Sequence, residues 1–424
     1  MKILHILNES LPSLAGYTIR SASIVRFQAE LGLEPVVVTS PHHEPAPTAD
    51  VEMIDGIRHY RSVPCRGHRV PFLHEARMVR RMTARIIEVV EIERPDILHA
   101  HSPCLWGQAA ARAARRCGLP FVYEIRGFWE DAAVDMGKTR PGSLRYRLSR
   151  ALETRVARSA DVVTTIAEHL KEDLVRRGLD ERRIMLVPNG VDADRFRPLQ
   201  PDASLRSAWG LDGCIAIGYV GTLFPWEGVE DLVQVVPAIL RGAPQARFLI
   251  IGTGRQEGPI RRLIEQLHLA DYVRFVGKVP HEDVLRYYSI LDVLVYPRKS
   301  TRNTELVTPL KPLEAMAMEK AVLGSDVGGI RELLVAGTGS LYRAGNLADL
   351  AARCIELAKD PRRREALRKN ARSHVVAARN WKTLAAVYVD VYSIATQAKR
   401  CPAPRDVAEA ESGLTEPITV DSAT

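Results

Sequence analysis

The chain has 424 residues, of which 46% are hydrophobic and 26% charged, and its formal net charge is +8. These values are ordinary for a globular protein and exclude a fibrous or largely disordered chain. The aromatic content of 6% argues against a stacking platform for single-stranded nucleic acid, so no nucleic-acid partner is expected. The six cysteines form no CxxC pair, which indicates free thiols in a reducing compartment.

The first residues form a short apolar run that ends in polar residues, which is typical of a strand and not of a signal peptide. No run of 18 apolar residues occurs, so no simple transmembrane helix is predicted. We therefore predict a cytoplasmic protein, with attachment to the inner face of the membrane as the alternative.

Short apolar runs alternate with helical patterns along the chain, as in a parallel sheet wrapped by helices. In the first half, strands are predicted at residues 2–7, 35–40, 96–101, 121–125 and 161–166. A turn-rich break at 187–202 follows. Further strands are then predicted at 214–221, 246–252, 272–277, 292–297 and 321–326. We predict an α/β protein of two facing Rossmann-like domains, with helices on both faces of each sheet and the ligand in the cleft between them.

The same patterns give the domain boundaries. We predict a first domain over residues 1–188, a linker over 189–212 and a second domain over 213–378. A helix over 379–396 is expected to cross back to the first domain. The end of the chain, 397–424, is polar and has no hydrophobic periodicity, so it is predicted to be disordered.

Glycine-bearing turns follow several predicted strands. Gly16 precedes the first predicted helix, and the turns GYVGTLFPWEG and IIGTGRQEG follow strands of the second domain. Because glycine has no Cβ, backbone N–H groups can approach a phosphate there. The alternative for each is a purely structural turn, and the last turn only approximates a dinucleotide fingerprint. Together, the three turns predict a diphosphate held by backbone amides.

The strand over 96–101 ends in His99 and His101, which we predict to point to opposite faces of the sheet. Only one is expected to face the cleft, and His101 is the candidate, with a hydrogen-bonded structural histidine as the alternative. Nearby residues do not complete a metal site. Asp192 and Asp194 form a DxD pattern, but they follow an Asn-Gly turn in the linker, so no metal is expected.

The stretch from 296 to 334 is the most informative. A helix is predicted to begin near Pro312, a residue favoured in the first turn. Its positive N-terminus and the charge of Lys311 suit a phosphate. Glu314 can accept hydrogen bonds from two vicinal hydroxyls, as on a ribose, and the alternative is an acid stabilised by the helix dipole alone.

A basic amphipathic helix is predicted over residues 74–93. Its arginines alternate with apolar residues, and they are Arg77, Arg80, Arg81 and Arg85. One interpretation is peripheral contact with anionic lipid or with a lipid-phosphate acceptor. The other, weighed equally, is a helix that covers the sheet and has a charged outer face.

Taken in order, these motifs resemble glycosyltransferase family 4, whose members are retaining enzymes of the GT-B fold. The resemblance covers nearly all of residues 1–396. It rests on the Gly16 loop, HAH, VPNGVDADRF, GYVG, IIGTG, VRFVGKVPHEDVLRYYSILDVLVYP and PLEAMAMEKAVLGSDVGGIREL. The segments GYTIRS, VYEIRGFWEDAA and YPRKSTRNTELVTPLKPLEAMA are similar to a subgroup found with exopolysaccharide biosynthesis.

The resemblance implies that the first domain binds the acceptor, a carbohydrate or a lipid-linked molecule, and the second domain the nucleotide sugar. It implies that Glu314 binds the ribose, that Glu305 faces the donor sugar and that His101 lies beside the reacting anomeric carbon. Further donor-site positions are Gly16, Gly221, Thr222, Gly252, Gly254, Lys278, Val279, Leu310 and Pro312. The nucleotide sugar is a substrate, and no cofactor is implied.

The chain departs from the family in two places. Glu305 and Glu314 have eight residues between them, whereas the family has seven. The basic residues that the family places around the GYVG turn are replaced by Thr222 and Glu227. Because a leaving diphosphate needs positive charge, we hypothesise that other cations supply it. The candidates are Lys311, Arg298, Lys299 and Arg302.

The predicted function is therefore transfer of a sugar from a nucleotide-diphosphate sugar to an acceptor hydroxyl, in polysaccharide or glycoconjugate synthesis. Two alternatives remain open. The replaced basic residues also fit a non-catalytic, membrane-associated scaffold of the same fold. A nicotinamide-dependent oxidoreductase would share the Rossmann pattern, but it should carry a true GxGxxG motif.

Overall fold

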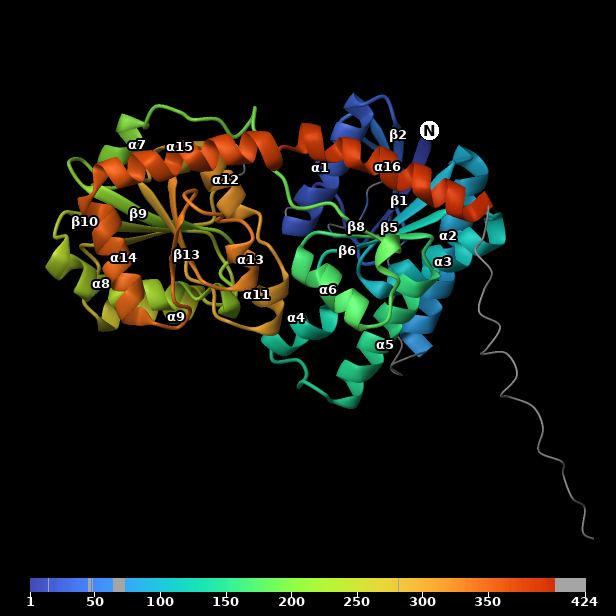
Figure 1. Cartoon of the computed structure of the whole chain (residues 1–424), viewed down its shortest axis with the longest axis horizontal. Helices are drawn as coiled ribbons and strands as arrows, with labels where there is room; N and C mark the ends of the chain where they lie inside the picture. Colours follow the sequence, from blue (N-terminus) through green and yellow to red (C-terminus); the bar gives the residue numbers. More distant parts are fainter. Residues whose placement is uncertain (14, 45–46, 48, 64–72, 281, 401–424) are drawn as a thin grey trace, which may run out of the picture.

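The computed structural model describes residues 1–13, 15–44, 47, 49–63, 73–280 and 282–400. The chain folds into two α/β domains that lie side by side, each with a mostly parallel sheet between layers of helices (Figure 1). The predicted fold class is confirmed. Of the end predicted to be disordered, residues 397–400 continue a helix, and residues 401–424 lie outside the described part.

The first sheet has eight strands in the order β3-β4-β2-β1-β5-β6-β7-β8, and only the β3–β4 pair is antiparallel. The strands are β1 (Lys2–Leu7), β2 (Glu34–Thr39), β3 (Val51–Ile54), β4 (Ile57–Tyr60), β5 (Ile97–His101), β6 (Phe121–Ile125), β7 (Val162–Thr165) and β8 (Ile184–Leu186). Strand β1 lies between β2 and β5 in the sheet. The chain first continues to β2 on one side of β1 and later returns to form β5 on the other side, so the strand order reverses at β1. Ligands of such sheets bind at this switch point, beyond the carboxyl ends of the strands.

The second sheet has six parallel strands in the order β11-β10-β9-β12-β13-β14. They are β9 (Ile215–Val220), β10 (Ala246–Ile251), β11 (Val273–Gly277), β12 (Val293–Tyr296), β13 (Ala321–Ser325) and β14 (Ser340–Tyr342). Most are continuous apolar runs because helices bury both faces of the sheet. The switch point lies between β9 and β12.

Helices cover both sheets. Those of the first domain are α1 (Gly16–Glu30), α2 (Leu73–Glu93), α3 (Cys104–Cys117), α4 (Trp129–Asp135), α5 (Leu144–Ser159) and α6 (Glu168–Arg176). Those that follow are α7 (Ala203–Ala208), α8 (Val229–Gly242), α9 (Glu257–Gln266), α10 (Val284–Ser289), α11 (Arg302–Leu306), α12 (Lys311–Ala317), α13 (Gly328–Arg331), α14 (Leu347–Lys359), α15 (Pro361–Ala378) and α16 (Trp381–Arg400).

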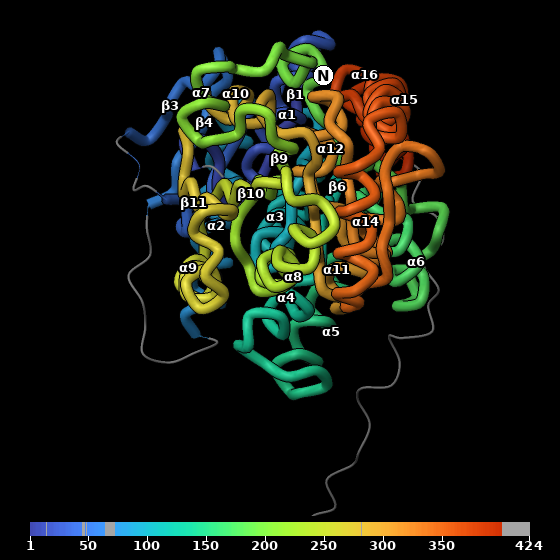
Figure 2. The backbone as a smooth tube through the Cα atoms, turned by 90° about the vertical axis from the view of Figure 1, so that its left-hand side faces the viewer, coloured from blue at the N-terminus to red at the C-terminus, as the bar shows by residue number. Residues whose placement is uncertain are grey.

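The chain passes between the domains at two adjacent places. The N–H of Val191 donates to the carbonyl of Arg379 at 2.8 Å, and the N–H of Trp381 donates to the carbonyl of Val191 at 3.1 Å. After this crossing, α16 lies on the first domain, where it packs in one apolar cluster with Ile3 and Val122 of the sheet. Figure 2 shows α15 and α16 along one side of the molecule, far from α4 and α5 at its lower end.

Helix α2 has the position of a sheet-covering helix. Its apolar residues are buried, among them Met78, Met82 and Ile86, which belong to the core of the first domain together with α3. Of the four arginines, Arg77, Arg80 and Arg81 are exposed. The guanidinium of Arg85 instead pairs with Asp50 at 2.5 Å and with Glu88 at 2.9 Å. The apolar side of α2 is therefore not free to enter a membrane, so any lipid contact of this helix would rest on its exposed arginines alone.

Candidate active site

A cavity of about 640 Å³ lies between the two domains, at the carboxyl ends of the strands that flank both switch points. The first domain contributes the start of α1 and the residue after β6. The second domain contributes the turns after β9 and β10, the residue after β11 and the segment that leads into α12. The lining includes predicted donor-site residues from both domains, which are Gly16, Gly221, Thr222, Gly252, Lys278, Val279, Arg298, Leu310, Lys311 and Glu314.

The glycines around the cavity differ in whether the surrounding protein leaves room for a side chain. Gly252 has φ of 138°, and a Cβ there would lie 1.8 Å from the carbonyl oxygen of Gly221. Gly254 lies outside the cavity wall, and its Cβ would meet the backbone of Leu223 at 2.6 Å, so its role is packing and not donor contact. A Cβ on Gly16 would meet only Leu310, at an ordinary 3.8 Å. Packing within the protein therefore leaves room for a side chain at Gly16.

A lysine–glutamate pair forms the start of α12. The ammonium of Lys311 lies 2.8 Å from Oε2 of Glu314, and the hydroxyl of Tyr288 donates to the same oxygen at 3.0 Å. Burial and the charge of Glu314 raise the pKa of Tyr288 well above its ordinary value, so the hydroxyl stays a donor. Pro312 is buried in the first turn and does not line the cavity. Its position in the first turn favours the start of the helix.

The candidate cations separate into two groups. Arg298 lines the cavity, donates to the carbonyl of Val307 at 3.0 Å and lies 3.4 Å from Glu227. Glu227, in the turn after β9, thus pairs with Arg298, which follows β12. Two other candidates lie outside the cavity wall, because Lys299 pairs with Glu230 and Arg302 pairs across the domains. The partners of Arg302 are Asp131 at 3.0 Å and Asp173 at 2.5 Å.

Glu305 does not face the cavity. Its Oε2 accepts from the N–H of Gly328 at 2.7 Å and its Oε1 from the hydroxyl of Ser300 at 2.7 Å. The carboxylate thus ties α11 to α13, and Asn303 is the residue of α11 that lines the cavity. This corrects the expectation that Glu305 faces the donor sugar. The spacing between Glu305 and Glu314, which is one residue longer than in the family, occurs together with this different orientation of Glu305.

His101 also lies behind the cavity wall, because Arg126 covers it. His101 is 2% exposed and does not line the cavity, whereas Arg126 does. Arg126 directly follows β6, in the segment VYEIRGFWEDAA. A polar residue directly after a buried strand is a sequence signal for a site residue, and Arg126 has this position although it was not among the predicted site residues. Arg126 therefore lies between His101 and the cavity, at the place where the resemblance implied His101 beside the reacting anomeric carbon.

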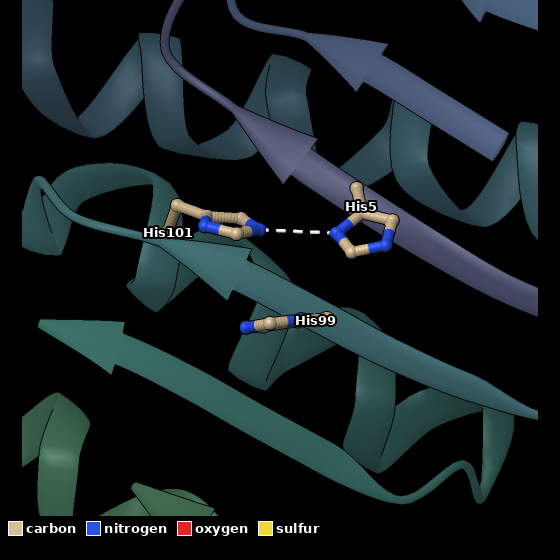
Figure 3. A group of neighbouring side chains, drawn as sticks. All are labelled: His5, His99 and His101. Atoms are coloured by element: carbon tan, nitrogen blue, oxygen red, sulfur yellow. Dashed lines mark hydrogen bonds between the residues drawn. The ribbon is translucent and has the colours of Figure 1, made fainter. Parts of the chain in front are cut away.

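Three buried histidines lie together behind Arg126 (Figure 3). They are His5, His99 and His101, whose ligand-type nitrogens lie within 4.8 Å of one another. His99 and His101 are two residues apart on β5, so they point to the same face of the sheet, and their stacked rings have centroids 4.2 Å apart. The prediction that they point to opposite faces is wrong. Burial, with the charge of His101, lowers the pKa of His5 to about 3, and burial, with Arg126, lowers that of His101 to about 4. The imidazoles are therefore neutral at pH 7. Hydrogen bonds already occupy most of their nitrogens, and Arg126 beside them opposes a bound cation.

Glu124 of β6 anchors the same region. It is fully buried and lies 3.1 Å from Nε of Arg20 and 2.6 Å from Nε of Arg126. Burial alone would raise the pKa of Glu124, but the two arginines hold it well below its usual range. The carboxylate therefore stays ionised and fixes Arg126 at the cavity wall.

Two facing Rossmann-like domains with a cavity at their switch points define the GT-B class of glycosyltransferases. A family model described as glycosyl transferase 4-like domain matches residues 15–190, and one described as glycosyl transferases group 1 matches residues 206–374. The chain belongs to the glycosyltransferases, with a family 4-like first domain and a group 1 second domain. It is accordingly an enzyme of glycosyl transfer, and the oxidoreductase alternative is set aside.

The chain is similar to several named glycosyltransferases. A GDP-mannose-dependent alpha-mannosyltransferase of Mycolicibacterium smegmatis is 27% identical over 79% of this chain and 82% of that protein. D-inositol 3-phosphate glycosyltransferase 2 of Catenulispora acidiphila is 27% identical over 89% of this chain and 90% of that protein. A GDP-mannose-dependent phosphatidylinositol monomannoside mannosyltransferase of Corynebacterium glutamicum is 28% identical, over 56% of this chain and 63% of that protein.

Solved structures share the fold. A sucrose-phosphate synthase from Thermosynechococcus elongatus has a TM-score of 0.74 at 22% identity, over 94% of this chain and 99% of that chain. Anabaena HepE in complex with UDP and glucose has a TM-score of 0.73 at 17% identity, over 93% and 99% of the two chains.

Proposed function

We propose that the protein transfers a sugar from a nucleoside-diphosphate sugar to an acceptor hydroxyl with retention of configuration, in polysaccharide or glycoconjugate synthesis. One observation carries the proposal: the glycine turns of both domains and the Lys311–Glu314 pair line one cavity. Its volume of about 640 Å³ is within the range of small-molecule sites. The Anabaena neighbour was solved with UDP and glucose, and two relatives are named for GDP-mannose.

In this proposal the ribose of the donor binds Glu314, and Lys278 and Val279 line the nucleobase. The diphosphate lies between the glycine turns and the cations Lys311 and Arg298. These two cations take the place of the basic residues that the turn after β9 lacks, which is the role hypothesised for them from the sequence. Gly16 leaves open space on the side of the first domain.

During transfer, the bond between the anomeric carbon and the phosphate oxygen breaks while the acceptor oxygen bonds to the same face of that carbon. The departing phosphate takes the acceptor proton. Two carboxylates line the cavity among the described residues, Glu227 and Glu314, and each already has a basic partner. Neither suits a free nucleophile, which supports transfer without a covalent enzyme intermediate. Arg126 donates a hydrogen bond to the transferred sugar or to the leaving phosphate.

The donor site is tested by removing a cation. Lys311→Ala is expected to weaken the binding of UDP or GDP, whichever raises the Tm of the wild type, by roughly 10–100-fold, because a charge-assisted hydrogen bond is lost. Lys299→Ala is the matched control. It removes a neighbouring cation that pairs with Glu230 outside the cavity, so binding should change by less than about threefold.

Equal affinities for the two variants would remove Lys311 from the diphosphate site. Release of nucleoside diphosphate from UDP-glucose or GDP-mannose by the wild type would distinguish the enzyme from a non-catalytic scaffold. A protein that binds nucleotide but never releases it from any sugar nucleotide would favour the scaffold.

The proposed partners include an anionic membrane, and the face that supports this contact is α5 with the turn before it, not α2. The exposed side of α5 carries Leu144 (74% exposed) and Leu148 (47% exposed) next to Arg145 and Arg147. Residues 136–159 contain seven basic residues and one acid, the fully buried Glu153. Apolar side chains between unpaired arginines are typical of a helix that lies in a membrane interface.

We expect the wild type to sediment with vesicles of phosphatidylglycerol and phosphatidylcholine and to be released by salt. Leu144→Glu together with Leu148→Glu should abolish this binding, whereas Arg77→Glu together with Arg80→Glu on α2 should reduce it only through net charge. Loss of binding in the α2 variant alone would return the contact to α2. Among the described residues, no helix combines the length and apolar character needed to cross a bilayer.

A further inference from the structure

The last helix of the chain, α16, carries two buried tyrosines that reach the back of the active-site cavity. Tyr388 and Tyr392 are both fully buried against the first domain. Their hydroxyls form hydrogen bonds to polar residues of the first domain behind Arg126, which are Arg20, Gln28, His99 and Glu124. The apolar packing of α16 on the sheet does not depend on these hydroxyls. A helix that only covered the sheet could use phenylalanine at both positions.

Tyr392 is the second-last member of a hydrogen-bond chain that begins at Arg126 and ends at His99. A guanidinium N–H can only donate, so Nδ1 of His101 accepts from Nη2 of Arg126. The neutral ring of His101 therefore carries its proton on Nε2, which donates to Nδ1 of His5 at 3.0 Å (Figure 3). By the same reasoning, His5 carries its proton on Nε2.

The chain continues in one direction. Nε2 of His5 donates to Oε1 of Gln28 at 2.9 Å, and Nε2 of Gln28 donates to the hydroxyl of Tyr392 at 2.8 Å. The hydroxyl, having accepted, donates to Nδ1 of His99 at 2.9 Å. Each member has one donor and one acceptor role, so the chain can reverse only as a whole. Reversal would put a proton on Nδ1 of His101, directly against Arg126.

This direction matters at the cavity because Arg126 is otherwise almost fully engaged. Its Nε donates to Glu124, and its Nη1 donates to the carbonyl of Tyr17 at 2.6 Å and to the hydroxyl of Ser21 at 2.8 Å. With Nη2 also bound to His101, one N–H of the guanidinium remains for a ligand. Nη2 of Arg126 can donate to His101 only while Nδ1 of His101 carries no proton. The tautomer of His101 therefore determines the position of the remaining N–H of Arg126.

Tyr388 acts on the same arginine by a second route. Its hydroxyl donates to Oε2 of Glu124, the carboxylate that holds Arg126, and accepts from Nη2 of Arg20 at 3.2 Å. Both tyrosines therefore join α16 to the two groups that fix the guanidinium.

We propose that Tyr392 and Tyr388 are positioning residues for the transfer reaction, which hold Arg126 in its productive place through the histidine chain and through Glu124. The inference rests on the role proposed above for Arg126. It makes α16 part of the catalytic apparatus and not only a cover of the first sheet.

Tyr392→Phe removes the hydroxyl that accepts from Gln28 and donates to His99. It should lower kcat for release of nucleoside diphosphate from UDP-glucose or GDP-mannose by roughly tenfold, with the Kd of UDP or GDP unchanged. Tyr123→Phe is the matched control, since its hydroxyl is equally buried in the same domain but donates to Glu153, outside the chain. Equal turnover of the two variants would overturn the proposal.

A double-mutant cycle separates positioning from general stability. Gln28→Leu breaks the same chain one member earlier, so the variant with Gln28→Leu and Tyr392→Phe should be no slower than either single variant. Additive losses would mean that the two residues act independently and would contradict the chain. If Tyr392→Phe does not fold, Tyr388→Phe gives the corresponding test through Glu124.

A readout without substrate keeps this inference separate from the proposed function. Ring-nitrogen NMR of the ¹⁵N-histidine-labelled full chain should show His5, His99 and His101 each with the proton on Nε2, and Tyr392→Phe should produce a mixture at His5 and His101. A wild-type His101 protonated on Nδ1 would overturn the chain, whatever the substrate of the enzyme.

Discussion

Arg126→Met is expected to lower the turnover number of the enzyme by roughly 10²–10³-fold, the usual effect of removing one fixed hydrogen-bond donor from a transition state. The Kd of UDP or GDP should change far less than turnover, because, apart from the Gly16 loop, the proposed nucleotide contacts come from the second domain. The measurement is single-turnover release of nucleoside diphosphate, together with calorimetric binding of the nucleotide.

Arg126→Lys is the companion variant. It keeps a positive charge beside Glu124, so the buried carboxylate retains a partner, but a single ammonium cannot reach Tyr17, Ser21 and His101 in the same fork geometry. We expect this variant to fold like the wild type and still to be slow. Turnover within a few-fold of the wild type in both variants would exclude Arg126 as a catalytic residue.

Gly252→Ala is expected to destabilise the protein by at least about 3 kcal/mol, since a methyl group in an already tight site at an unfavourable backbone angle cannot be accommodated without moving the backbone. The Cβ would lie 1.8 Å from the carbonyl oxygen of Gly221, and φ is 138°. Urea-induced unfolding of the full chain would measure the loss.

Gly16→Ala is the matched comparison for a glycine that the protein itself does not require. Its Cβ meets only Leu310 at 3.8 Å, so the unfolding free energy should stay within about 0.5 kcal/mol of the wild type. Affinity for UDP or GDP should nevertheless fall, because the methyl group occupies space proposed for the diphosphate. Normal nucleotide affinity in Gly16→Ala would remove this loop from the donor site.

The sequence was sufficient for the fold because each long strand is an apolar run bounded by turn residues. All ten predicted strands are present, whereas β3, β4, β8 and β14 were missed, and β14 has three residues. Residues 51–54 and 57–60 form a short hairpin in which half-exposed and charged residues interrupt the apolar pattern, and β8 has three residues. Strands of this length carry too few side chains for periodicity to be recognised.

Within the site, the sequence predicted which turns and helix starts form the cavity more reliably than which side chains line it. Lys311 and Glu314 could be predicted because they lie next to each other at one helix start. Lys299 and Arg302 could not be excluded, since the acids that bind them are up to 171 residues away in the chain. The choice of His101 over His99 failed because residues two apart on a strand share a face. The strand pattern also does not show what covers that face, which here is Arg126.

The two crossings between domains have a consequence for how the protein is made. Residues 381–400 cover part of the first sheet, yet the ribosome synthesises them after the entire second domain. Until then, apolar side chains such as Ile3 and Val122 remain uncovered, and the first domain cannot reach its final packing. The core of the first domain is therefore complete only once α16 has been synthesised, and a first domain produced without α16 would leave these apolar side chains exposed.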